Sequence, residues 1–228
     1  MKKVRVDRPR ALPSALEELG LVPPLLTLVL SGGAARVEVS EFARLRPVIE
    51  EISGVAERVG AVVVDGGTDE GVMRLMGQAR ARGRSFPLVG VVVASLAVEP
   101  GATLTGEQAV LEPNHTHVVL VPGRRWGDEV PWLAGVAGVL AGDAPSATVL
   151  VNGGEIAYAD VAASVSAQRP VLAIDGTGRT ADALAAACRG EQSDPRARSL
   201  TESGLVQAIN VRENHHLVEL ERILSGRS

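Results

Sequence analysis

Aromatic residues and cysteine are the scarcest residue types in this sequence of 228 residues. Aromatic residues make up 2% of the chain, and Cys188 is the single cysteine. One cysteine excludes an internal disulfide framework and a zinc site built of cysteines, and it fits a reducing compartment. We interpret Cys188 as a small core residue on the apolar face of a helix. Because aromatic residues are so few, the core must consist of Val, Leu, Ile and Ala, which is typical of a sheet buried on both faces by helices.

Basic residues are also fewer than acidic ones. The chain has 23 Lys and Arg against 27 Asp and Glu, a formal net charge of -4. It has no basic cluster with an aromatic platform, so we expect no nucleic acid as a partner. The basic N-terminus and the apolar run 21–35 resemble a signal peptide, but Glu17, Glu18 and two prolines interrupt the pattern. We therefore expect a cytoplasmic protein with no membrane span.

Glycine-rich turns, by contrast, recur along the chain. The clearest is at 61–77, where three valines lead to Asp65, two glycines and a threonine, followed by residues with helical spacing. The same order of strand, turn and helix recurs at 29–35, 150–161 and 173–185. Strands that alternate with helices form mostly parallel sheets. We predict a Rossmann-like, doubly wound α/β fold with a mostly parallel sheet of about seven strands in three layers. Residues 24–228 would form this single domain, after an N-terminal leader of residues 1–23.

Two parts of the chain depart from this regular alternation. The segment 94–114 has no strong period and is long for a connection in a compact α/β domain. It is either a candidate lid over the glycine turns or a solvated excursion. Pro47 lies within a helical pattern, and we predict that it begins a new helix there, because proline is tolerated only near a helix start.

The glycine turns all follow strands, so we expect them to meet at the carboxyl edge of the sheet, where such sheets bind ligands. Backbone N–H groups at helix starts attract anions, most often phosphate. Arg179 stands at such a start and is suited to clamp a phosphate; alternatively, it pairs with Asp182. The turns thus give these candidate ligand-binding residues: Gly32, Gly33, Gly66, Gly67, Thr68, Asn152, Gly153, Gly154, Glu155, Gly176, Thr177, Gly178 and Arg179.

Two histidines and one motif bear on metals and cofactors. His115 and His117 are two residues apart at the start of a strand and should face the same side. This spacing also suits a metal, but no third ligand is apparent, so we expect histidines that form hydrogen bonds beside the turns and no metal. Residues 176–181 match the dinucleotide fingerprint without the acidic residue expected about 20 positions later. We therefore expect no nicotinamide, flavin or other cofactor.

The residues just before the predicted helix 128–141 allow two interpretations. The carboxylates of Asp128 and Glu129 would cap the helix and interact with its dipole. Alternatively, Trp126 would stack on a base and Glu129 would accept a hydrogen bond from a ribose hydroxyl. The sequence leaves both interpretations open.

Four motifs together resemble a known family. In order they read VVVDGGTDEGVMRLMGQA, LEPNHTHVVLVPGRRWGDEVPWL, VLVNGGEIAYADV and PVLAIDGTGRTADALAAA. From about Leu25 to Ala187 the chain is similar to the SLOG domain of melastatin-type TRP channels, especially its stand-alone prokaryotic form. The resemblance implies a Rossmann-like fold that binds a nucleotide-derived ligand, which in the channels is ADP-ribose. The positions that match its motifs are Gly66, Gly67, Thr68, Gly71, Met73, His115, His117, Gly153, Gly154, Gly176, Gly178, Arg179 and Asp182.

The wider superfamily contains LOG-type phosphoribohydrolases, which form homodimers and carry a glutamate in a PGGxGTxxE turn. Here that turn reads NGGEIAYAD, with Asp160 at the glutamate position. The leading hypothesis is a binding or sensor protein for an ADP-ribose-like ligand. One alternative is a nucleotide N-glycosidase with Asp160 or Glu155 as the acid–base group. The other is an interaction scaffold with a vestigial pocket. A homodimer is possible through the apolar helix residues Val136, Val139 and Leu140, which could equally be core.

Overall fold

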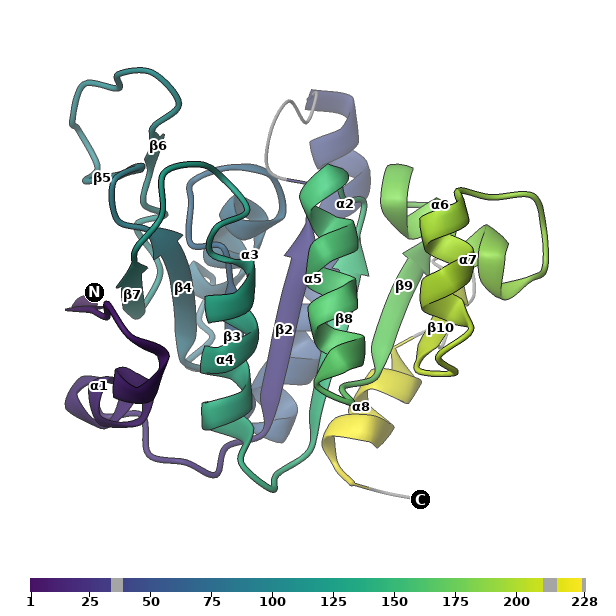
Figure 1. Cartoon of the computed structure of the whole chain (residues 1–228), viewed down its shortest axis with the longest axis horizontal. Helices are drawn as coiled ribbons and strands as arrows, with labels where there is room; N and C mark the ends of the chain where they lie inside the picture. Colours follow the sequence, from purple (N-terminus) through teal and green to yellow (C-terminus); the bar gives the residue numbers. More distant parts are fainter. Residues whose placement is uncertain (34–38, 211–216, 227–228) are drawn as a thin grey trace.

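The computed structural model of the chain describes residues 1–33, 39–210 and 217–226. Its centre is an eight-stranded sheet in the order β1-β7-β4-β3-β2-β8-β9-β10, in which every pair of neighbours is parallel (Figure 1). The Rossmann-like prediction is confirmed, with eight strands in the main sheet. The strands are β1 (Lys2–Arg5), β2 (Thr27–Gly32), β3 (Val62–Asp65), β4 (Leu88–Val93), β7 (His117–Val121), β8 (Ser146–Val151), β9 (Val171–Asp175) and β10 (Val206–Asn210). A separate parallel pair joins β5 (Ala97–Val98) to β6 (Ala109–Val110).

Helices cover both faces of the sheet, which explains why its inner strands are nearly continuous apolar runs. On one face lie α2 (Val39–Val59), α3 (Gly71–Ala81) and α8 (Val218–Leu224). On the other lie α1 (Leu12–Leu19), α4 (Val130–Ala141), α5 (Glu155–Ser166), α6 (Arg179–Cys188) and α7 (Pro195–Thr201), with a short 3-10 turn, η1 (Pro9–Ala11), before α1. None of the described helices is both long and apolar enough to cross a lipid bilayer.

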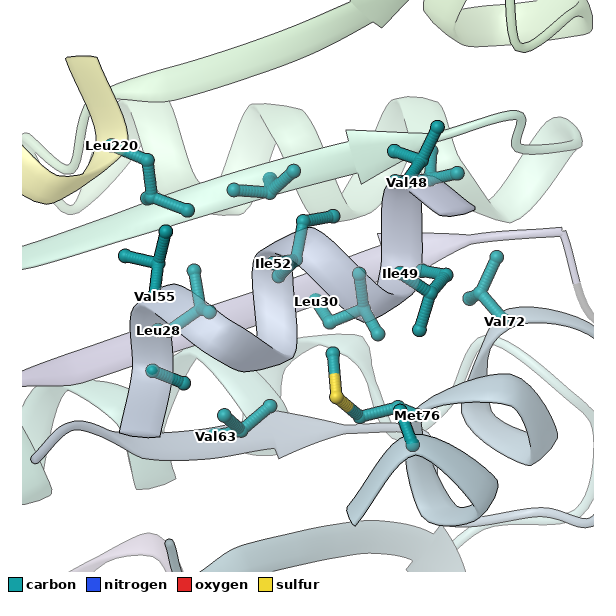
Figure 2. Packing of buried hydrophobic residues seen from close by; sticks show 14 of the residues in the cluster. Leu28, Leu30, Val48, Ile49, Ile52, Val55, Val63, Val72, Met76 and Leu220 are labelled. Carbon is teal, nitrogen blue, oxygen red and sulfur yellow. The ribbon is translucent and has the colours of Figure 1, made fainter. Parts of the chain in front are cut away.

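The largest core cluster lies between α2 and the strands in the middle of the sheet. Figure 2 shows Ile49 and Ile52 of α2 above Leu28 and Leu30 of β2. Burying each such side chain stabilises the fold by roughly 1.5–3 kcal/mol. The sheet positions that carry the glycine turns are therefore held on a rigid frame.

The N-terminal segment belongs to the sheet edge and to the second helix layer. Strand β1 pairs in parallel with β7, with Lys2 opposite His117. Helix α1 packs against α4, and Leu16 lies in the same buried cluster as Leu133. The sequence KKVR of β1 contains one apolar residue and is mostly exposed, so it gave no strand signal. The leader of residues 1–23 is thus integrated into the three layers.

Two predictions for single residues are wrong. Helix α2 continues through Pro47 and does not begin there. Proline inside a helix costs about 3 kcal/mol, but its neighbours Val48 and Ile49 are buried against the sheet, and this packing opposes the cost. Cys188 is exposed at the end of α6, with its thiol 3.5 Å from the carbonyl oxygen of Val206, and is not part of the core.

The direction of the strand connections reverses between β2 and β8. From β2 the chain proceeds through α2 to β3, and from β8 it proceeds through α5, on the opposite face, to β9. Sheets of this kind bind ligands beyond the carboxyl ends of the strands at such a reversal. We call this place the β2–β8 junction and define it by Gly32, Gly33, Asn152, Gly153 and Gly154.

Candidate functional site

The two turns of the β2–β8 junction are in direct contact. A Cβ atom on Gly33 would lie 2.7 Å from Oδ1 of Asn152, and one on Gly32 would overlap the carbonyl oxygen of Val151. Neither position has room for a side chain. The N–H of Val72 in α3 donates to the carbonyl of Gly33 at 3.1 Å, so the turn after β3 is joined to the turns after β2 and β8. The first three predicted turns thus meet at one place.

Asn152 lies at the centre of the junction and is fully buried. Its side-chain Nδ2 donates to the carbonyl of Thr177 at 2.8 Å, and its backbone N–H donates to Thr177 Oγ1 at 2.8 Å. Its Oδ1 has no hydrogen-bond partner in the part of the chain that the structure describes. A buried acceptor without a partner costs about 1–3 kcal/mol, and each such group in a native protein calls for an explanation.

The fourth turn, 176–179, joins the same cluster through Thr177, but its amide groups are already occupied. Asp182 Oδ1 accepts the N–H of Gly176 at 2.8 Å and the N–H of Gly178 at 2.9 Å. An internal carboxylate thus occupies the two amides that we expected to hold a phosphate, and ligand binding at this turn stays a prediction. The alternative pair between Asp182 and Arg179 is not formed.

Arg179 is exposed, and its side chain has no hydrogen bond or ion pair with any described residue. Its backbone φ is 52°, in the left-handed region that side chains other than glycine rarely adopt. Asn152 shares this property, with a φ of 63°. Strained backbone of this kind persists where the surroundings enforce it and gathers at ligand sites. Arg44 of α2 reaches the same turn and donates to the carbonyl of Thr177 at 3.2 Å.

Helix α5 begins beside Arg179 and has no side-chain cap. Its N-cap residue is Gly154, whose carbonyl accepts Thr180 Oγ1 at 3.0 Å, so the starts of α5 and α6 are adjacent. The N–H groups of an uncapped first turn and the positive end of the helix dipole favour an anion. Glu155, the first residue of α5, turns its carboxylate outward to Arg196 at 2.6 Å.

A partly buried carboxyl group lies at the end of β2. Ser31 Oγ donates to Asp160 Oδ2 at 2.7 Å. Burial raises the pKa of Asp160 to about 6, against the opposing effect of the Ser31 hydrogen bond and with a further contribution from the charge of Glu129. Burial also raises the pKa of Glu129, which accepts the N–H of Gly127 at 2.8 Å. Of the two predicted acid–base residues, the structure brings Asp160 to the junction and directs Glu155 to α7.

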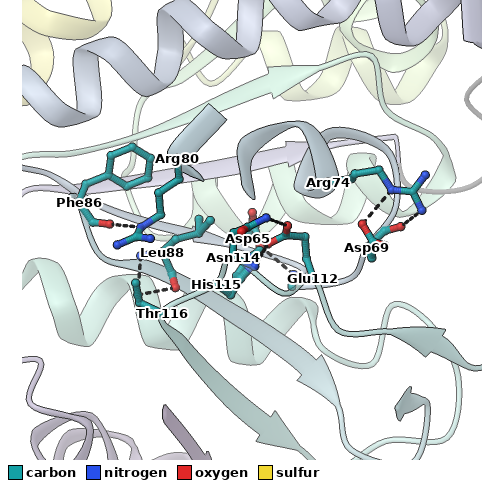
Figure 3. Close-up of polar contacts among 11 residues, drawn as sticks. Asp65, Asp69, Arg74, Arg80, Phe86, Leu88, Glu112, Asn114, His115 and Thr116 are labelled. Atoms are coloured by element: carbon teal, nitrogen blue, oxygen red, sulfur yellow. Dashed lines mark hydrogen bonds and ion pairs between the residues drawn. The ribbon is translucent and has the colours of Figure 1, made fainter. Parts of the chain in front are cut away.

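The turn after β3 rests on a buried histidine (Figure 3). His115 Nε2 lies 2.8 Å from Asp65 Oδ1, and His115 Nδ1 lies 2.8 Å from Glu112 Oε2. Asp65 Oδ1 also accepts the N–H of Gly67 at 2.7 Å. Burial lowers the pKa of His115, but the two carboxylates outweigh this effect and raise it to about 9. With both ring nitrogens engaged and 2% of the residue exposed, His115 supports the turn from beneath and offers no free ring nitrogen to a ligand.

His117 is separated from His115 and from the glycine turns. It is the first residue of β7, opposite Lys2, and therefore lies at the amino edge of the sheet. Its Nδ1 is 2.7 Å from Thr116 Oγ1, and burial lowers its pKa. The prediction that both histidines lie beside the glycine turns is wrong for His117. Within residues 1–33, 39–210 and 217–226, no group of three or more His, Cys, Asp or Glu is placed to hold a metal ion.

The turn after β3, which holds the remaining predicted residues, is joined to the segment 94–114. Thr68 forms a bridge with Leu111, and the N–H of Glu112 donates to the carbonyl of Gly67 at 3.0 Å. Gly71 begins α3, and Met73 lies buried next to Gly66. The end of the segment is thus fastened to the turn after β3. Trp126 Nε1 donates to the carbonyl of Glu107 at 2.8 Å, so the indole also binds this segment.

Comparison with known proteins identifies a matching family and a solved structure of similar fold. The family model described as "SLOG in TRPM, prokaryote" matches residues 25–219. No curated protein matches the chain. The X-ray structure of TM1055, a target of the Northeast Structural Genomics Consortium, is similar with a TM-score of 0.58 and 19% identity. The match covers 85% of this chain and 96% of that one. At this identity the likeness shows the fold alone.

Proposed function

The chain belongs to the family described as SLOG in TRPM, prokaryote, and we propose that it is a sensor or binding protein for a nucleotide-derived ligand. The ligand class is that of ADP-ribose, and the binding place is the β2–β8 junction. The observation that carries the proposal is Arg179. Its guanidinium has no partner among the described residues, and the next residue, Thr180, contacts Gly154 at the start of α5.

Arg179 and α5 would bind a phosphate group together. A guanidinium binds phosphate through two parallel N–H···O bonds, and the first-turn N–H groups of a helix bind the remaining oxygens. Asp182 keeps the amides of Gly176 and Gly178 occupied, so the phosphate belongs on the α5 side of the turn. The protein itself thus fills the turn at Gly176 and Gly178, and it also occupies the N–H of Gly67 after β3, so the start of α5 is the place left for a phosphate.

Asn152 supports a nucleoside part in the same ligand. Its free Oδ1 is an acceptor, which matches a ribose hydroxyl or an exocyclic amino group as donor. A Cβ on Gly33 would lie 2.7 Å from this atom, so the acceptor lies directly beside the end of β2. Satisfying this acceptor would contribute to affinity, because none of the described residues gives it a hydrogen bond.

Calorimetric titration with ADP-ribose, AMP and cyclic ADP-ribose tests the proposal. We expect saturable binding of at least one of them, and a loss of about tenfold or more in Arg179→Ala, which corresponds to about 1.4 kcal/mol. Arg198→Ala is the matched control, because Arg198 is exposed on α7 and its side chain has no partner among the described residues. Gly33→Ala should also weaken binding by crowding Asn152. Absence of heat with every compound would refute the proposal.

The carboxyl group of Asp160 favours one second candidate, a nucleotide N-glycosidase. A carboxyl with a pKa near 6 is suited to general acid–base catalysis near neutral pH. In this reaction water adds to C1′ as the bond from C1′ to the base breaks, and the base leaves with the electron pair of that bond. Asp160 accepts the proton of the water and then passes it to the base. Chromatography of the incubated nucleotides for free base or ribose phosphate decides the matter. Asp160→Asn should abolish product, while Glu155→Gln should not; an unchanged rate in Asp160→Asn excludes that residue from the chemistry.

A further inference from the structure

A hollow of about 630 Å³ lies at the carboxyl ends of β1, β4 and β7. These strands lie on the far side of β3 from the β2–β8 junction. The polar residues that line the hollow are Arg5, Ser95, Arg124, Arg125 and Asp128, and we call it the arginine hollow. It shares no residue with the junction.

The loop that follows β7 is fixed in place on one side of the hollow. Gly123 has no room for a side chain, because a Cβ there would lie 2.8 Å from Cβ of Asp128 and 2.9 Å from Cγ1 of Val93. Asp128 Oδ2 accepts the N–H of Arg124 at 2.8 Å and that of Arg125 at 3.2 Å. Ser95 Oγ donates to the carbonyl of Gly123 at 2.9 Å, which joins the ends of β4 and β7. The main chain that carries the two arginines is therefore preorganised.

The charges around the hollow are unbalanced. Three guanidinium groups face one carboxylate, in a chain whose formal net charge is -4. Arg125 is paired with Asp128 at 3.3 Å. Arg5 and Arg124 are exposed, and neither side chain has a hydrogen bond or an ion pair with any residue that the structure describes. Arg5 comes from β1 and Arg124 from the loop after β7, so the pairing of these two strands brings the unpaired cations to one hollow.

We propose that the arginine hollow binds the phosphate group of a small phosphorylated molecule through Arg5 and Arg124. Guanidinium groups match the geometry of phosphate oxygens, and unpaired ones lose no internal ion pair on binding. The volume lies within the range of sites for small molecules, and the position is the sheet edge at which parallel sheets bind ligands. An acidic peptide would need a longer basic surface than these two side chains provide.

Titration of the full chain with methyl phosphate, followed by amide NMR, tests this proposal. We expect saturable shifts of the amides of Ala94, Ser95, Gly123 and Arg124, and much smaller shifts with methyl sulfate, which carries one charge. The double variant Arg5→Gln/Arg124→Gln should lose at least about tenfold in affinity. Arg8→Gln is the matched control, because Arg8 is exposed, has no side-chain partner among the described residues and does not line the hollow.

The test of the arginine hollow and the test of the β2–β8 junction give separate results. Arg179→Ala should leave the methyl phosphate shifts of the hollow unchanged, so each site can fail alone. The single variant Arg124→Gln, in a loop, gives a second measurement if the change in β1 disturbs folding. Shifts that do not saturate, that are equal with methyl sulfate or that persist in the double variant overturn the proposal. So does a glutamate-rich peptide that shifts these amides where methyl phosphate does not.

Discussion

The Nε2 atom of His115 lies 2.8 Å from Oδ1 of Asp65, and both side chains are closed off from solvent. Glu112 occupies the other ring nitrogen at the same distance. The three residues come from the end of β3, the end of the segment 94–114 and the chain just before β7. A charged imidazole between two carboxylates therefore holds three connections together beneath the turn at Gly67.

This arrangement predicts that stability falls at alkaline pH. The pKa of His115 is about 9 in the folded protein, above its ordinary value of 6.5. Its contribution is therefore complete below about pH 6.5 and is lost as the pH rises through about 9. We expect the free energy of unfolding to drop by on the order of 3 kcal/mol across this window, measured by urea denaturation at a series of pH values.

Two histidine variants serve as test and control for this pH dependence. His115→Gln removes the titrating group, so its stability should be lower at pH 6.5 and should change much less toward pH 10. His117→Gln should keep the alkaline loss, because the pKa of His117 is lowered by burial and the ring titrates at lower pH. If His115→Gln retained the alkaline loss of the wild type, another group would be responsible for it.

The contact of Glu112 with α3 predicts opposite effects for one substitution at two helix positions. A Cβ on Gly77 would overlap the carboxyl group of Glu112, whereas a Cβ on Gly138 in α4 meets nothing within 4 Å. We expect Gly77→Ala to lower the free energy of unfolding by about 3 kcal/mol, since the carboxylate would be displaced from His115. Gly138→Ala should raise it by about 0.5–1 kcal/mol, because alanine favours the helix. Equal effects in chemical denaturation would contradict the tight fit at Gly77.

The environment of Asp160 predicts a gain in stability when its charge is removed. Its pKa is raised from 3.8 to about 6, so ionisation opposes folding and wild-type stability falls as the pH rises through this interval. Asp160→Asn can still accept the hydrogen bond of Ser31 and should be more stable than wild type at pH 7.5 by on the order of 2 kcal/mol. At pH 4 the two proteins should differ little. Asp143→Asn, which replaces an exposed carboxylate, is the matched control.

The sequence predicts the strand and turn pattern well, because glycine turns after apolar runs are local features. Residues Gly32 and Gly33 and residues Asn152 to Gly154 lie at the carboxyl ends of β2 and β8, as the alternation of strands and helices indicates. Which group binds the amides of each turn, by contrast, depends on side-chain conformation and not on the local sequence pattern. Asp182 fills the turn at Gly176 through its side-chain conformation, and the letters alone do not separate this from a pair with Arg179.

Contacts between distant segments could not be predicted from the sequence for the same reason. His115 and Asp65 are fifty positions apart, and only the order β3, β4, β7 brings them together. The unpaired cations of the arginine hollow depend on β1, whose polar sequence gave no sign of a strand. Pro47 and Cys188 show the converse case, in which the surroundings override what the residue type suggests. Packing against the sheet keeps Pro47 inside a helix, and Cys188 stays exposed because nothing covers it at the end of α6 among the described residues.

The turn after β3 touches β4 through two glycines. A methyl group on Gly67 would lie 2.8 Å from Cα of Gly90, and one on Gly90 would lie 2.6 Å from Cα of Gly67. Each methyl group would meet main chain, which cannot turn aside as a side chain can, so a change at one position has no compensating change at the other. In a library that randomises both codons, surviving variants should therefore carry glycine at both positions, because no pair of larger residues fits there.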